Sequence, residues 1–176
     1  MLRGERIGLR ARQEADLPVL MDELYDDVES RSRADSRPWV PKPANAKSGP
    51  YAVDDLPDTV ACFSVVELQS KKLAGDAVLW AIDLHNRIGH LGVSIRPLYR
   101  GQGLASDVVR VLCHYGFDIR GLNRLQIETL VDNEPMRRAA VAAGFSLEGT
   151  LRGGAWVLGG FVDEVVYGLL AAEWRS

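Results

Sequence analysis

Residues 91–105 restrict the fold more than any other stretch, because they combine a strand, a turn and the start of a helix. The run Leu91-Gly92-Val93-Ser94-Ile95 is short and apolar, which predicts a strand. A turn follows, with glycines at positions 101 and 103. Beyond it, apolar residues recur at the spacing of one buried helix face. These residues are Leu104, Val108, Val111, Leu112, Tyr115 and Ile119.

The two glycines lie where this predicted helix begins, and that position favours an anion. The first amides of a helix have no partners within it and lie at the positive end of its dipole. Gly101 and Gly103 carry no side chain that would keep a phosphate at a distance. A plain turn is the alternative interpretation. A P-loop is excluded because no Gly-Lys-Ser/Thr follows, and a dinucleotide fingerprint because its third glycine is missing.

The neighbouring residues give this turn a family resemblance. Arg100-x-x-Gly103-x-Ala105 resembles the pyrophosphate motif of the GNAT superfamily of N-acetyltransferases, in particular its ribosomal-protein alanine acetyltransferase branch. Asn133 with Gly144-Phe145 resembles the second cofactor motif of that family. The resemblance covers nearly the whole chain and is weakest over residues 31–58. It implies a GNAT fold of the α/β (α+β) class, with a mixed central sheet of about seven strands, a splayed parallel pair and about four flanking helices.

Periodicity and turn residues predict approximate element boundaries. Strands are expected at residues 6–10, 59–68, 73–84, 88–95, 124–131, 145–152 and 162–170, and helices from Glu14, from Leu104 and over 136–143. Residues 30–57 lack a period and contain prolines at 38, 41, 43, 50 and 57, which predicts an irregular exposed segment with room for one helical turn. This segment is either a loop that lines the acceptor site with Trp39 and Tyr51 or a surface excursion held down by those two aromatics.

Composition sets the outer limits. The chain of 176 residues suits one domain over residues 1–176, and its 47% hydrophobic and 26% charged residues are ordinary for a globular protein. A net charge of −3 gives no reason to expect nucleic acid or an anionic membrane as a partner. Cys62 and Cys113 have no metal-like spacing, so we expect no metal site. Without a signal region or a membrane-length apolar run, a cytoplasmic location is expected.

The resemblance implies how coenzyme A, as acetyl-CoA, would be bound. The strand before the turn and the strand at residues 126–131 would be parallel and diverge, and pantetheine amides would satisfy their free backbone groups. The residues implied in cofactor binding are Val93, Ser94, Ile95, Arg100, Gly101, Gln102, Gly103, Leu104, Ala105, Asn133, Met136 and Arg138. Asn133 is equally a good helix N-cap, and surface arginines such as Arg137 and Arg138 need no ligand.

The implied reaction is direct attack of a neutral amine on the thioester through a tetrahedral oxyanion, with a backbone amide near Val93 as oxyanion donor. Two positions where the family often carries the acid that protonates the leaving thiolate hold Ala140 and Met136. A water, Tyr99 or Tyr167 could substitute. The candidate bases are Glu67, Asp76, Asp83, His85, His90, Glu128 and Asp163. Glu128 stands out, because a carboxylate on a central strand is costly unless it is used or paired.

Three functions fit these residues. The first is an acetyl-CoA-dependent N-acetyltransferase acting on a primary amine of a protein N-terminus or a small molecule. The second is a non-catalytic acyl-CoA binding or sensing domain, which would explain the missing acids. The third is a transferase for longer acyl groups or for a hydroxyl acceptor. The acceptor side would be formed by the first helix, residues 30–57 and a loop at residues 153–161 with Trp156. The resemblance also makes a homodimer through the closing strands an expectation.

Overall fold

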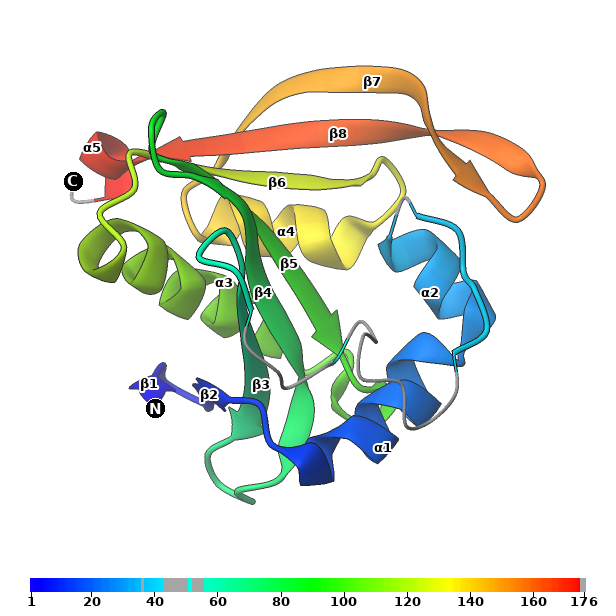
Figure 1. Cartoon of the computed structure of the whole chain (residues 1–176). Coiled ribbons are helices and arrows are strands. Elements are labelled where there is room, and N and C mark those ends of the chain that lie inside the picture. Colours follow the sequence, from blue (N-terminus) through cyan, green and yellow to red (C-terminus); the bar gives the residue numbers. More distant parts are fainter. Residues whose placement is uncertain (36, 43–50, 52–55, 175–176) are drawn as a thin grey trace.

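The computed structural model describes residues 1–35, 37–42, 51 and 56–174. Its strands form one eight-stranded sheet in the order β1-β2-β3-β4-β5-β6-β8-β7 (Figure 1). Their bounds are β1 Leu2–Arg3, β2 Ile7–Ala11, β3 Ala61–Glu67, β4 Leu73–Asp83, β5 Ile88–Ile95, β6 Arg124–Leu130, β7 Ser146–Val157 and β8 Gly160–Leu170. All neighbouring strands are antiparallel except β5 and β6, which are parallel. The predicted fold class is confirmed, and β1, which pairs with β2, is the strand that the sequence did not indicate.

The helices cover both faces of the sheet. Their bounds are α1 Leu17–Leu20, α2 Val28–Ala34, α3 Leu104–His114, α4 Glu134–Ala142 and α5 Ala171–Trp174. Short 3₁₀ turns at Glu14–Asp16 and Pro97–Tyr99 precede α1 and α3, and π-helical turns at Met21–Tyr25 and Tyr115–Ile119 continue them. The main core lies between the sheet and α3 with α4, whereas α1 and its π-helical turn pack on the opposite face around Tyr51.

The stripe predicted for the long helix forms its buried face, with one exception. Leu104, Val108, Val111 and Leu112 are all at most 5% exposed. Ile119 is 52% exposed, so the prediction that it faces the core was wrong. The cause is local, because the π-helical turn at Tyr115–Ile119 has more residues per turn and rotates its last residue out of the stripe.

Two connections differ from expectation. The predicted loop at residues 153–161 was wrong, because β7 continues to Val157 and a turn at Leu158-Gly159 leads directly into β8. Gly153 and Gly154 lie inside β7, at a register shift between Leu151 and Ala155. The helical turn that residues 30–57 left room for is α2, which begins before that segment and is longer than one turn; Asp27 caps it by accepting from the amide of Ser30. Residues 36, 43–50 and 52–55 of that segment lie outside the described residues.

Candidate active site

The sheet opens between β5 and β6. The two strands share only three residue pairs, the last of which joins His90 to Gln126. Beyond that pair β5 continues to Ile95 and β6 to Leu130, and Figure 1 shows the two strands diverging. The diverging pair expected at residues 91–95 and 126–131 is therefore present.

Strand alternation shows which backbone groups face the opening. The Arg96 amide donates to the β4 carbonyl of Ala74 at 2.9 Å, so the amides of even-numbered β5 residues point toward β4. The polar backbone groups of Val93 and Ile95 then point toward β6, where the described ladder has ended. The Ile95 carbonyl accepts from Nε of Arg100 at 3.0 Å, which is consistent with that direction. Val93 presents its amide to the opening, as the predicted oxyanion donor must.

The glycine turn leaves space at the start of α3. Gly101 and Gly103 have φ values of +74° and +76°, and nothing lies within 4 Å of a Cβ built on either residue. Gly103 is the N-cap of α3 and offers no side chain to its first amides, which include those of Leu104 and Ala105. Leu104 is itself buried, so only its backbone is available. These features fit an anion such as a pyrophosphate.

A buried carboxylate holds this turn in place. Oδ2 of Asp107 accepts from the amides of Arg6 and Ile7 at 2.8 and 3.0 Å, and Oδ1 from that of Glu5 at 3.1 Å. The Arg6 side chain in turn donates to the Gln102 carbonyl at 2.6 Å. The sequence analysis missed Asp107, although a charged residue one turn after Leu104 on the apolar face of α3 was a usable signal.

The second predicted cofactor motif starts α4. Oδ1 of Asn133 accepts from the Met136 amide at 3.3 Å, and Nδ2 donates to Thr129 Oγ1 at 2.9 Å. The capping interpretation of Asn133 is thus confirmed, while a contact with pantetheine stays a prediction. Met136 packs partly buried against the main core. Arg138 is exposed on α4 beside an open cavity whose lining is Glu134, Arg137, Arg138, Val141, Ala142 and Tyr167.

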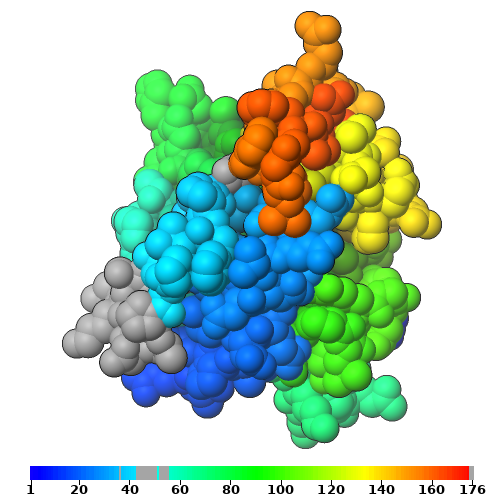
Figure 2. All heavy atoms as spheres, turned by 90° about the vertical axis from the view of Figure 1, so that its right-hand side faces the viewer, coloured from blue at the N-terminus to red at the C-terminus, as the bar shows by residue number. Residues whose placement is uncertain are grey.

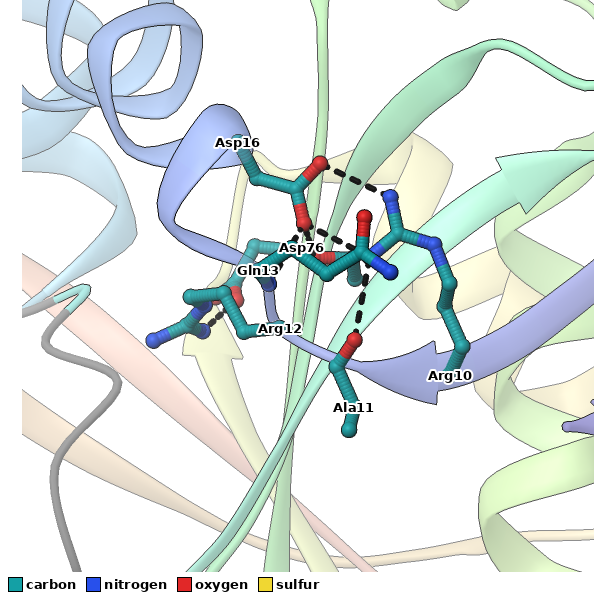
Figure 3. Close-up of polar contacts among 7 residues, drawn as sticks. Arg10, Ala11, Arg12, Gln13, Asp16 and Asp76 are labelled. Carbon is teal, nitrogen blue, oxygen red and sulfur yellow. Dashed lines mark hydrogen bonds and ion pairs between the residues drawn. The ribbon is translucent and has the colours of Figure 1, made fainter.

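Most of the candidate bases are engaged in structure. Glu67 accepts from the amides of the β3–β4 turn, and Asp83 from those of the β4–β5 turn that includes His85. Asp163 accepts from the Gly153 amide at 2.7 Å. Asp76 forms an ion pair with Arg12 beneath the start of the first helical segment (Figure 3). Each of these contacts gives the carboxylate concerned a structural role.

Glu128 and His90 differ from that group. Oε1 of Glu128 lies 3.6 Å from Nδ1 of His90, and their side chains are 33% and 20% exposed. The same oxygen accepts from Nε2 of Gln126 at 2.6 Å. Burial lowers the pKa of His90, nearby Glu128 raises it, and Arg124 lowers it again, so the net pKa is below its usual value. A partly exposed carboxylate and an imidazole with a lowered pKa therefore lie next to each other where β5 and β6 part.

The residues proposed as thiolate acids are packed or hydrogen-bonded. Tyr99 is 8% exposed, with the guanidinium of Arg96 5.7 Å from its ring centroid. The hydroxyl of Tyr167 accepts from Nε of Arg137 at 3.3 Å on the α4 side of the sheet. Arg96, whose pKa is raised by its hydrogen bond to Glu23, connects the turn to the first helical segment.

The segments predicted to form the acceptor side include α2 and the end of the β7–β8 hairpin, which lie beside one another in Figure 2. Arg33 of α2 pairs with Asp132 at 2.7 Å, immediately before Asn133. Tyr51 and Trp39 pack against the cluster around Leu20 on the first helical segment, so their anchoring role is confirmed. Trp156 is 60% exposed on β7.

An α+β sheet that divides between parallel strands above a glycine-containing helix start defines the class of GNAT acyltransferases. A family model described as an acetyltransferase (GNAT) domain matches residues 6–146, and the chain belongs to that family of N-acetyltransferases. No helix formed by the described residues is long and apolar enough to cross a membrane.

Three relatives illustrate the similarity. The Bacillus subtilis (strain 168) protein named "Putative ribosomal N-acetyltransferase YdaF" is 36% identical over 109 residues, which span 62% of this chain and 60% of the relative, less than two thirds of its length. The Bacillus licheniformis protein named "Uncharacterized N-acetyltransferase p20" is 26% identical over 98% of this chain and 97% of its own. The spermidine N-acetyltransferase structure from Vibrio cholerae, solved with CoA and spermine, has a TM-score of 0.81 at 20% identity over 97% of this chain and 99% of that chain, a likeness of fold.

Proposed function

We propose that this chain, acting as one domain over residues 1–176, transfers an acetyl group from acetyl-CoA to a primary amine. The opening between β5 and β6 beside the glycine turn carries the proposal. The Val93 amide points to the side where the β5–β6 ladder has ended, and the first amides of α3 have no side-chain cap. Pantetheine amides and a pyrophosphate supply acceptors for such donors.

Residues on both sides of the opening would bind acetyl-CoA. Backbone groups of Val93 and Ile95 would contact pantetheine, with Ser94 between them paired to β4, and the amides of residues 101–105 would contact the pyrophosphate. Arg100 and Arg138 would reach further phosphate oxygens, because guanidinium groups match phosphate geometry. Asn133 and Met136 would flank the arm at the start of α4.

Two groups of the chain would serve the chemistry. The Val93 amide would donate to the thioester oxygen as negative charge develops there, an interaction worth about 3 kcal/mol in comparable sites. Glu128 would take a proton from the acceptor ammonium, because it is a partly exposed carboxylate just beyond the last β5–β6 pair. Acetyl-CoA would supply the acetyl group as a thioester, whose carbonyl carbon an amine can attack.

We infer that the acceptor is a protein N-terminus, such as that of a ribosomal protein, or a small polyamine. The name of YdaF and the branch motif Arg100-x-x-Gly103-x-Ala105 favour the first, and the spermidine acetyltransferase fold favours the second. The acceptor would enter between α2 and the β7–β8 hairpin. A cytoplasmic location and a homodimer accompany this proposal.

Calorimetry tests whether the protein binds acetyl-CoA at the proposed site. Gly103→Glu places charge and bulk where the pyrophosphate would lie and should abolish micromolar binding. Gly159→Glu is the matched control, because its φ is also positive, at +97°, and nothing lies within 4 Å of its Cβ position. Unchanged binding to the Gly103 variant would contradict the assignment. Binding without turnover on a panel of N-terminal peptides and polyamines would instead favour the acyl-CoA sensor.

A further inference from the structure

His90 and Glu128 meet where β5 and β6 part. His90 pairs with Gln126 in the last residue pair of the parallel ladder. Glu128 lies two residues further along β6. Residues two apart on a strand share a face, so the Glu128 carboxylate turns back toward the imidazole. The 3.6 Å between Nδ1 of His90 and Oε1 of Glu128 leaves no room for another group between them.

The imidazole is fixed from its other side. Trp80 is the partner of His90 on β4, and their ring centroids are 4.8 Å apart at an interplanar angle of 42°. Nδ1 of His90 is buried and has no hydrogen-bond partner among the residues described. Most buried polar atoms in folded proteins have a hydrogen-bond partner, so this nitrogen calls for an explanation. Oε1 of Glu128 is the carboxylate oxygen 3.6 Å from this atom.

The surrounding charges leave the pair able to receive a proton. Arg124 is held by Glu148 at 2.8 Å and donates to Gln126 at 3.0 Å. Glu164 on β8 also faces Glu128, and burial together with Glu128 raises the pKa of Glu164. The carboxylates on this face therefore favour positive charge near Glu128.

We propose that His90 is a positioning residue that holds, through Glu128, the proton lost by the acceptor ammonium. This inference rests on the proposed acetyl transfer. A carboxylate alone is a weak base toward an alkylammonium, whereas an imidazole nitrogen 3.6 Å away offers the proton a second site and makes the transfer less unfavourable.

The protons balance as follows. The ammonium gives one proton to Glu128, which passes it to Nδ1 of His90 and regains its charge. The neutral amine attacks the thioester carbon, the carbon–sulfur bond breaks, and the second amine proton goes to the departing thiolate. The third remains on the amide product. His90 later releases its proton to solvent.

Two acceptors with different amine pKa values test the proposal. One carries an alkylamine with a pKa near 10, and the other an α-amino group with a pKa of about 8, which is partly neutral without help. For His90→Gln at pH 7, kcat/KM should fall roughly tenfold or more with the first acceptor and much less with the second. The deficit should shrink as the pH rises toward 10, and KM for acetyl-CoA should not change. His114→Gln, on the exposed end of α3, is the control.

A merely structural role would lower both rates by the same factor at every pH, and that outcome would overturn the inference. NMR titration of the His90 ring adds a measurement that needs no turnover. Its pKa should fall in Glu128→Gln, because the carboxylate that favours the charged imidazole is removed. An unchanged pKa would also overturn the inference, while leaving the proposed transfer intact. Absence of transfer to any amine would overturn the proposed function itself.

Discussion

Asp76 on β4 and Glu128 on β6 lie on opposite sides of β5 and on the same face of the sheet, but their surroundings differ. Asp76 lies opposite Ser94 in a continuous ladder, and its side chain is 13% exposed beside Arg12, which is 4% exposed. Glu128 lies beyond the last parallel pair and is 33% exposed. A carboxylate on this face is neutralised where the overlying segment brings a guanidinium, and it stays accessible where the sheet itself opens.

Paired truncations should separate the two carboxylates most sharply. Asp76→Ala should lower the free energy of unfolding by about 3–5 kcal/mol, because a buried guanidinium loses its carboxylate. Glu128→Ala should change that energy by less than about 1 kcal/mol and lower kcat roughly 100-fold or more. Urea unfolding and steady-state rates of the same two variants make the comparison. A stable Asp76→Ala protein with greatly reduced kcat would reverse the assignment of the two carboxylates.

Sequence patterns located the strand, the glycine turn and α3, because those features depend on neighbours within a few residues. They could not choose among seven candidate bases. Arg12 meets Asp76 across 64 residues of sequence, and no local pattern records that contact. The pairing of His90 with Glu128 likewise depends on where the β5–β6 ladder ends. Asp107 differs, since its place on the apolar face of α3 was visible in the sequence.

The continuous antiparallel part of the sheet, from β1 to β5, carries a second ion pair, between Arg10 and Asp16. Asp16, 5% exposed, accepts from Arg10 at 2.7 and 2.8 Å and from the Ser64 hydroxyl at 2.7 Å (Figure 3). Burial raises the pKa of Asp16, but the hydrogen bonds from Arg10, Ser64 and the Gln13 amide outweigh it and lower the pKa to about 2.

A depressed pKa gives a stability contribution that is present above the unfolded-state pKa near 4 and is lost as the pH falls toward 2. The shift corresponds to about 2 kcal/mol. The stability difference between the wild type and Asp16→Asn should therefore shrink by about that amount between pH 5 and pH 2. Urea unfolding across this range measures it, with Asp22→Asn on the exposed helix surface as control. A stability difference that does not depend on pH would show that the ionised form of Asp16 does not stabilise the fold.

The smallest effect is expected just after β6, at the ion pair between Arg33 of α2 and Asp132. Their side chains are 39% and 54% exposed, so Arg33→Ala should cost no more than about 1 kcal/mol, and less in high salt. Because this pair connects α2 to the residue before Asn133, its loss should raise KM for the amine acceptor and leave KM for acetyl-CoA unchanged. Steady-state kinetics at two salt concentrations tests both statements. A large loss of stability, or an equal rise in both KM values, would contradict the assignment of this pair to the acceptor side.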